Sequence, residues 1–185
     1  PAVDLGTGRK AKAIAAGYQH TCAILDNESV KCWGLNDDGQ LGLNDYDSRG
    51  DEEGEMGDNL PAVDLGTGRT AASIVTGHSH TCVMDDNASI KCWGKGEYGQ
   101  LGIGDQKSYN KPPQNVLELG SGKTAKAITA GDMHTCAILD NSSIKCWGKN
   151  DSGQLGQGDT DSRGDVTNEM GDNLLSIDLG SGKTA

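Results

Sequence analysis

The six cysteines of the chain are the residues whose type and spacing could do chemistry. They form three pairs, each with its members ten positions apart: Cys22 and Cys32, Cys82 and Cys92, Cys136 and Cys146. If the two members face each other across a hairpin at a non-hydrogen-bonded position, their Cα atoms lie within reach of a disulfide. Two other states stay open, reduced cysteines in a core and a metal site, although zinc usually has closer ligand spacing such as C-x2-C.

Catalysis is not indicated by these cysteines. A nucleophilic cysteine is not expected in identical triplicate, and no Ser/His/Asp or paired-carboxylate arrangement in the sequence suggests an active site. The paired glycines, such as Gly66-Thr-Gly68, lack the third glycine and the strand-to-helix context of a nucleotide-binding fingerprint. We therefore expect a protein that is not an enzyme and has no cofactor.

The segment between the paired cysteines carries a second chemical signal. Asn27, Asn87 and Asn141 each begin an Asn-x-Ser triplet in which x is not Pro. This is the acceptor sequence for N-linked glycans in secreted proteins. The same residues also suit a tight turn, because Asn tolerates the left-handed conformation and Ser bonds to the turn backbone. Both interpretations stay open.

A hairpin would position these cysteines and asparagines. With the cysteines opposite each other, Leu25 faces Ser29, and the turn falls on residues 26–28. The next facing pair is apolar in all three copies: Ile24 with Val30, Met84 with Ile90, and Ile138 with Ile144. This agreement supports the register, because a slip of one residue would turn every side chain to the other face.

The hairpin recurs because the chain is a repeat array. Residues 11–70, 71–124 and 125–184 form three repeats, and residues 1–10 match the end of a preceding one, which indicates a segment of a longer repetitive chain. Aromatic residues make up 4% of the sequence and Phe is absent, whereas there are 28 glycines, which favours many short strands over one large core. With three or four strands each, the repeats must stack to bury both faces of their sheets.

Each repeat carries one motif, seen first as Gly17, His20-Thr21, Val30, Trp33-Gly34 and Gly39-Gln40-Leu41-Gly42. The motif resembles the repeat of the regulator of chromosome condensation family over essentially the whole chain. The resemblance implies an all-β fold of propeller blades, normally seven four-stranded sheets in a ring. Three repeats fall short of a ring, so we expect a partial propeller or an open or assembled array.

Two further residue types recur at fixed places. We expect the histidines to share the cysteine face and to form interior hydrogen bonds: His20, His80 and His134. We expect the tryptophans to pack between blades: Trp33, Trp93 and Trp147.

The loops after the motif are polar and acidic. Their carboxylates are weak candidates for calcium ligands: Asp45, Asp47, Asp51, Asp159, Asp161 and Asp165. Oxygen ligands at close spacing suit Ca²⁺, but the EF-hand spacing is absent, and solvated acidic loops are the favoured interpretation. The middle loop, residues 105–114, differs from the other two and is the candidate patch for a partner.

Net charge, hydropathy and cysteine pairing exclude some classes of function. A net charge of −11 argues against a nucleic-acid partner, and no apolar run is long enough to span a membrane. Paired cysteines indicate an oxidising compartment, hence the extracellular space or the cell surface. We expect a structural or adhesion module whose partners are other copies or other repeats of the same chain. The alternative is a module that binds a protein or a glycan through its loops. The family's exchange-factor role on a small GTPase is least favoured, because the acidic charge and the paired cysteines oppose it.

Overall fold

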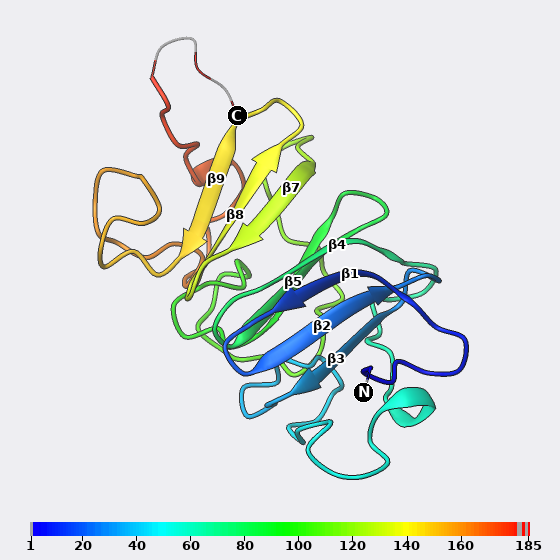
Figure 1. Ribbon diagram of the computed structural model, residues 1–185. Helices are drawn as coiled ribbons and strands as arrows, with labels where there is room; N and C mark the ends of the chain where they lie inside the picture. Colours follow the sequence, from blue (N-terminus) through cyan, green and yellow to red (C-terminus); the bar gives the residue numbers. More distant parts are fainter. Residues whose placement is uncertain (1, 181–182, 184) are drawn as a thin grey trace.

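The computed structural model describes residues 2–180, 183 and 185, and shows three antiparallel sheets of three strands each (Figure 1). The strands are β1 (Ala11–Ala16), β2 (His20–Leu25), β3 (Val30–Gly34), β4 (Ala71–Thr76), β5 (His80–Asp85), β6 (Ile90–Gly94), β7 (Ala125–Ala130), β8 (His134–Leu139) and β9 (Ile144–Gly148). Two single-turn 3-10 helices, η1 (Gly57–Asn59) and η2 (Gly171–Asn173), lie in the loops of the first and third repeats. The expected all-β fold is confirmed. Residues 1, 181, 182 and 184, which the predicted repeat boundaries include, lie outside the described residues.

The hairpins have the predicted register. Cys22 pairs with Cys32 and Ile24 with Val30, and the same register holds in the other two hairpins. A three-residue turn closes each hairpin, with Leu25 N donating to Ser29 O at 2.9 Å. The third turn residue is left-handed, as at Glu28 with φ of 65°. Such turns suit the twist of two antiparallel strands.

The fourth strand that the family resemblance implies is reduced to a single bridge. After the third strand, the chain returns to pair Gly34 with Arg49, Gly94 with Tyr109, and Gly148 with Arg163. The apolar segment that closes each repeat then adds one further bond, such as Val63 N to Val30 O at 2.8 Å. Three regular strands and one bridge therefore make up each blade.

The core lies between the sheets rather than within any one of them. The sheets follow one another in chain order, with β4 against β1 and β7 against β4 (Figure 1). The first core joins residues of two repeats: Cys22, Ile24, Val30, Cys32 and Leu41 from the first, and Ile74, Val83 and Trp93 from the second. A second core joins the second and third repeats in the same way. Each sheet is therefore stabilised by its neighbour, as in other repeat proteins.

No helix among the described residues has the length and apolarity needed to cross a membrane.

Candidate functional site

Each repeat contains one disulfide across its hairpin. The structure bonds Cys22 to Cys32, Cys82 to Cys92, and Cys136 to Cys146, with Cα–Cα distances of 4.1, 4.1 and 4.0 Å. The first two bridges are fully enclosed between neighbouring sheets, whereas Cys136 of the third is partly exposed. The bridges therefore tie two adjacent strands together in the middle of the surface on which repeats stack.

The histidines and threonines of the His-Thr motif bond across the stacked repeats. His20 Nε2 lies 2.9 Å from Thr81 Oγ1, and the Thr81 hydroxyl donates to the carbonyl of Gln40 at 2.9 Å. Because that hydroxyl donates its proton to the carbonyl, it accepts from Nε2–H, which requires an imidazole that is protonated at Nε2. His80 and Thr135 repeat the arrangement at 3.0 Å, with the carbonyl of Gln100 as acceptor.

Burial explains why these imidazoles stay neutral. It lowers the pKa of His80 to about 3, with a smaller contribution from the nearby His20 and His134. It likewise lowers the pKa of His20 to about 4, with a smaller contribution from His78. Within the described part of the chain, nothing bonds to the buried Nδ1 of either ring. The prediction that the histidines form interior hydrogen bonds is confirmed for these two.

The Gln-Leu-Gly turn of one repeat forms a socket for the tryptophan of the next. Trp93 is fully buried and its Nε1 donates to the carbonyl of Gln40 at 3.0 Å. A Cβ on Gly42 would lie 2.6 Å from that nitrogen, so only glycine leaves room for the ring. In the same way, Trp147 Nε1 donates to the carbonyl of Gln100 at 3.1 Å. The predicted packing between blades is confirmed for both rings, whereas Trp33 is partly exposed on the outer face of the first repeat.

We call this set of contacts the joint. One repeat supplies a histidine, a glutamine carbonyl and a glycine, and the following repeat supplies a threonine and a tryptophan. The described residues form two joints: His20, Gln40, Gly42, Thr81 and Trp93, then His80, Gln100, Gly102, Thr135 and Trp147. Sequence reasoning found the histidines and tryptophans but missed the glutamine carbonyl, because a backbone acceptor has no residue-type signal.

The asparagines of the three predicted acceptor triplets lie exposed at the hairpin tips. Asn27 Oδ1 accepts from the Ser29 hydroxyl at 2.8 Å, and Asn141 has the same bond to Ser143 at 2.7 Å. At Asn87 the Asp85 carboxylate instead accepts from the backbone N–H of Asn87 and of Ser89.

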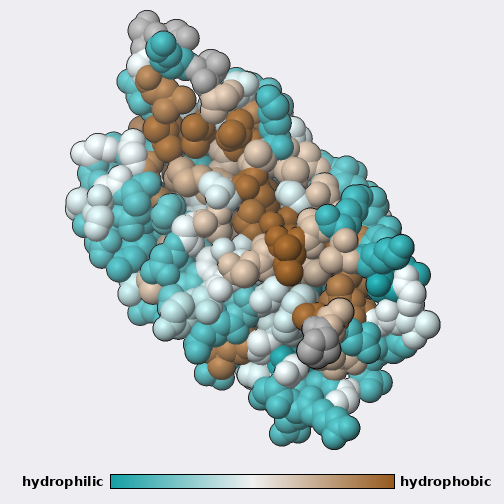
Figure 2. All heavy atoms as spheres, in the orientation of Figure 1, coloured by the Kyte–Doolittle hydropathy of each residue, from teal (hydrophilic) through white to brown (hydrophobic). Residues whose placement is uncertain are grey.

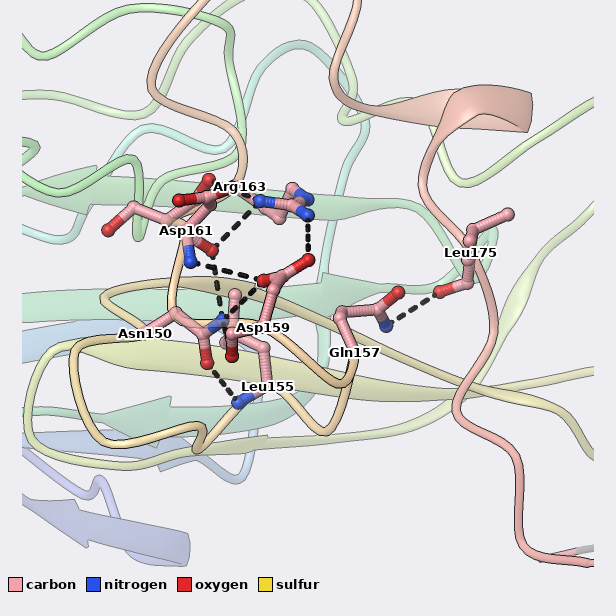
Figure 3. Close-up of polar contacts among 8 residues, drawn as sticks. Asn150, Leu155, Gln157, Asp159, Asp161, Arg163 and Leu175 are labelled. Carbon is pink, nitrogen blue, oxygen red and sulfur yellow. Dashed lines mark hydrogen bonds and ion pairs between the residues drawn. The ribbon is translucent and has the colours of Figure 1, made fainter.

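A fourth Asn-x-Ser triplet, Asn150-Asp151-Ser152, escaped the reasoning from sequence. Its asparagine is fully buried, and Nδ2 donates to the backbone carbonyls of Asp159 and Asp161 and to the Asp159 carboxylate (Figure 3). Because that nitrogen is enclosed and bonded, this asparagine organises a loop and does not offer its amide to solvent.

The acidic loops fold around arginines. Asp45 Oδ2 accepts from Arg49 Nη2 at 2.7 Å, and Asp159 accepts from Arg163 at the same distance (Figure 3). Asp47 and Asp161 contribute backbone carbonyls to the same loops. Asp51 is exposed, and Asp165 accepts from Gln106 Nε2 at 2.9 Å. Over the residues that the structure describes, no three His, Cys, Asp or Glu side chains converge on a possible metal position. Solvated acidic loops stay the favoured prediction here, and calcium binding stays the weaker one.

The divergent middle loop borders a groove of ≈ 1060 Å³ between the second and third repeats. Its apolar lining comes from both sides: Ile103, Tyr109, Pro112, Val116, Val166 and Met170. Tyr109 occupies the position of Arg49 in the first repeat, and its hydroxyl donates to Asp105 at 2.8 Å. The predicted patch therefore lies at a concave surface.

Known proteins share this sequence pattern. The profile of the regulator of chromosome condensation (RCC1) repeat matches residues 11–40, 71–100 and 125–154, and a second profile of that repeat matches 29–84 and 92–138. The ultraviolet-B receptor UVR8 of Arabidopsis thaliana is 34% identical over 155 residues, which are 83% of this chain and 33% of the receptor. The human E3 ubiquitin-protein ligase HERC2 is 31% identical over 80% of this chain and 3% of the ligase. The chain thus spans a third or less of these relatives.

Solved structures share the fold. Yeast RCC1 (Prp20) bound to Kap60 superimposes with a TM-score of 0.70 at 22% identity, over 91% of this chain and 37% of that one. Prp20p from Saccharomyces cerevisiae, which has binding properties to Gsp1p and histones, superimposes with a TM-score of 0.67 at 22% identity. The superposition covers 91% of this chain and 38% of that one. At this identity the likeness establishes the fold alone.

Proposed function

We propose that this chain, which belongs to the RCC1 repeat family, is a non-enzymatic structural or adhesion module of an extracellular or cell-surface assembly. The observation that supports this role is the disulfide across the hairpin in every repeat. Disulfides persist in oxidising compartments and are rare where glutathione keeps thiols reduced. In the chain-entropy model, a loop of this length contributes about 2–3 kcal/mol per bridge, which suits a module exposed outside the cell.

The redox state of the cysteines in the native source tests this proposal. Cells are lysed in a denaturing buffer with an alkylating reagent and no reductant, and the peptides that contain the six cysteines of this chain are mapped before and after reduction. We expect none of the six to be alkylated before reduction and all six to be alkylated afterwards, together with surface labelling of unpermeabilised cells by an antibody. Six alkylated cysteines in the unreduced sample would overturn the extracellular assignment.

We also propose that the hairpin tips carry N-linked glycans at Asn27, Asn87 and Asn141. All three are exposed, and the hydroxyl bond at Asn27 and Asn141 holds the acceptor triplet in a closed turn. The chain offers its own control, because Asn150 heads a triplet of the same kind but is buried. Peptide mapping after enzymatic deglycosylation should find modification at the tips and none at Asn150. Unmodified tips in protein secreted from eukaryotic cells would contradict this.

A second candidate function is binding of a protein through the groove beside the middle loop. Its support is the combination of a concave, partly apolar surface with a loop that differs from its two counterparts. Val116 and Val166 are exposed on the two sides of this groove. Changing either to Asp should abolish capture of a loop-bound partner, whereas Tyr46→Asp, in the first acidic loop, should leave it intact. Capture that all three variants retain would exclude the groove.

A further inference from the structure

Gly-x-Gly turns lie where one repeat ends and the next begins, and a short aspartate-bearing segment covers two of them. η1 of the first repeat covers residues 6–8, which lie in the N-terminal segment (Figure 1), and η2 of the third repeat covers residues 120–122. Figure 2 shows hydrophilic surface over the loop that carries η1, at the bottom of the view. The covering segment is Met-Gly-Asp-Asn-Leu in both repeats, at residues 56–60 and 170–174.

Three kinds of contact join the covering segment to the turn. The Asp58 carboxylate accepts from the backbone N–H of Thr7, at 2.8 Å, and from its hydroxyl. Gly57 N donates to the carbonyl of Asp4 at 3.1 Å, and the carbonyl of Gly57 accepts from the buried Lys31 ammonium at 2.7 Å. The third repeat has all three contacts, made by Glu118, Ser121, Lys145, Gly171 and Asp172.

Each covered turn binds a charged carboxylate. The hydrogen bonds from Thr7, with a smaller contribution from the Lys31 ammonium, hold the pKa of Asp58 below its usual value. The counterpart bonds lower the pKa of Asp172 in the same way. Hydrogen bonds to the ionised form and a nearby positive charge both favour ionisation. The turn therefore selects an aspartate anion over a neutral side chain.

The second repeat lacks the covering segment. In the first and third repeats, residues 50–62 and 164–176 connect the bridge beside the third strand to the segment that closes the repeat. In the second repeat only residues 110–116 make this connection, and they contain no acidic residue. The turn at residues 66–68 therefore receives no aspartate from this loop.

The space beside the first glycine of each turn shows the difference. A Cβ on Gly6 would lie 2.8 Å from the Asp58 carboxylate, and the covered turn of the third repeat is alike. Within the described residues, a Cβ on Gly66 would have only the side chains of Lys91 and Arg69 within 4 Å. In the part of the chain that the structure describes, the carboxylate of the other two turns therefore has no counterpart here.

The groups that bind the aspartate elsewhere are nevertheless in place around Gly66. Arg69 N donates to the carbonyl of Gly66 at 3.1 Å, which is the bond that closes the covered turns as well. Lys91 is buried, and its Nζ donates to a backbone carbonyl beside the turn at 3.0 Å, as its counterparts do. Thr67 lies exposed at the surface. We call this site the open turn: Asp64, Gly66, Thr67 and Lys91.

A hollow of ≈ 230 Å³ lies beside the open turn, between the first and second repeats. Pro61 and Asp64 border it on one side, and Lys111 and Pro112 of the shorter loop border it on the other. The turn and both borders belong to consecutive repeats of this chain, so internal residues form the whole site. It is distinct from the larger groove, which lies between the second and third repeats.

We propose that the open turn binds a peptide segment of a partner protein that contains Gly-Asp. In this contact the partner's aspartate accepts from the backbone N–H and the hydroxyl of Thr67. The carbonyl of its glycine accepts from Lys91 Nζ, and the glycine N–H donates to the carbonyl of Asp64. The two covered turns specify this chemistry, because each binds a Gly-Asp segment through the same three contacts.

Two-dimensional NMR of the oxidised 185-residue chain tests the site. The probe is the peptide Glu-Met-Gly-Asp-Asn-Leu, blocked at both ends, which is the covering segment of the first and third repeats with the residue before it. We expect the amide signals of Gly66 and Thr67 to shift saturably, whereas those of Thr7 and Ser121 stay in place. A probe with asparagine instead of aspartate should bind about tenfold more weakly, because it lacks the charge-assisted bonds.

Variants of the chain locate the binding. Thr67→Val removes one hydroxyl at an exposed residue and should weaken binding of the probe about fivefold. The matched control is Thr7→Val, the same change at a turn that Asp58 already covers, and it should leave binding unchanged. Replacing residues 110–116 with residues 50–62 supplies the covering segment within the chain and should abolish binding. Circular dichroism and the mass of the intact disulfides check that every variant is folded.

Four results would overturn the inference. One is the absence of a saturable shift at Thr67 with millimolar probe, and another is an asparagine probe that binds as tightly as the aspartate probe. The third is an equal effect of Thr67→Val and Thr7→Val, since it would place the binding elsewhere. The fourth is sodium acetate that shifts the same amides with the affinity of the peptide, since it would indicate a site for any small carboxylate.

The site goes beyond the proposed structural role, and the two are tested separately. Reduced cysteines in the native source would refute the extracellular assignment and leave the result with the peptide unaffected.

Discussion

The internal joints and the outer face of the third repeat share a histidine, a glutamine and a glycine, yet they differ in what covers these residues. His80 is enclosed between repeats, and burial lowers its pKa to about 3. His134 has the same place on its strand but is only partly buried, and the drop in its pKa is smaller. A strongly lowered histidine pKa, a fully enclosed tryptophan and a glycine with no room for a Cβ are therefore properties of a covered joint rather than of the repeat sequence.

Removing the tryptophan of a joint should have the largest effect on stability. Trp93→Ala empties a fully buried site and removes the bond to Gln40, and we expect a loss of about 3–5 kcal/mol in the free energy of unfolding. Trp33→Ala removes a partly exposed ring and should lower the free energy of unfolding by about 1 kcal/mol. Urea unfolding at a concentration where the chain is monomeric measures both. Equal losses of unfolding free energy in the two variants would mean that enclosure in the joint does not determine how much a tryptophan contributes to stability.

The glycine socket should respond next. Gly42→Ala would place a Cβ 2.6 Å from Trp93 Nε1 at a residue with φ of 75°, and should destabilise the fold by about 2–4 kcal/mol. Gly156→Ala has a similar φ of 68°, but its nearest contact is an ordinary 3.4 Å, so only the backbone strain of about 1 kcal/mol remains. Thermal unfolding of the two variants measures the difference. A larger loss at Gly156 would contradict the socket.

Lowering the pH should reduce stability more through the buried histidines than through the partly exposed His134. Because the folded-state pKa of His80 lies below the unfolded value of 6.5, the unfolded chain binds more protons between about pH 6.5 and 3. Stability is therefore complete above pH 6.5 and is lost as the pH falls, at about 1.4 kcal/mol per pH unit for this group. His80→Gln should flatten the slope of unfolding free energy against pH, and His134→Gln should change it less. Unchanged slopes in both variants would refute this account.

The acidic loops should matter least. Arg163→Ala removes the ion pair with Asp159, but both side chains are partly exposed, so the loss should stay below about 1 kcal/mol. Differential scanning calorimetry measures this change. Arg163→Lys, which keeps the positive charge, is the matched control. A loss as large as that of Trp93→Ala would mean that the loops contribute as much to the stability of the fold as the joints do.

Reasoning from sequence was most successful where side chains alternate. The cysteine, isoleucine and valine positions predicted the register, because one face of the hairpin is buried and a slip would expose it. It was less successful where the backbone does the bonding. The carbonyl of Gln40 accepts from both Trp93 and Thr81, and only the recurrence of Gln-Leu-Gly pointed to that turn.

Loop geometry was the other part that could not be predicted. Asn36 is fully buried and bonds across to Asp45, and Asn150 does the same in the third repeat, but the second repeat has Gly96 there. A Cβ at Gly96 would lie 1.9 Å from the carbonyl oxygen of Lys107, so that loop runs closer to its own turn. A spacing pattern does not encode such a close approach.

The hairpin disulfides also set how the chain would respond to pulling. A bridge between Cys22 and Cys32 removes ten residue steps from the path that carries tension, which is roughly 30 Å of extension per repeat. When a sheet is pulled open, the tip and its two strands stay clamped in register. After stretching, a repeat would therefore refold from an intact hairpin rather than from a fully extended chain.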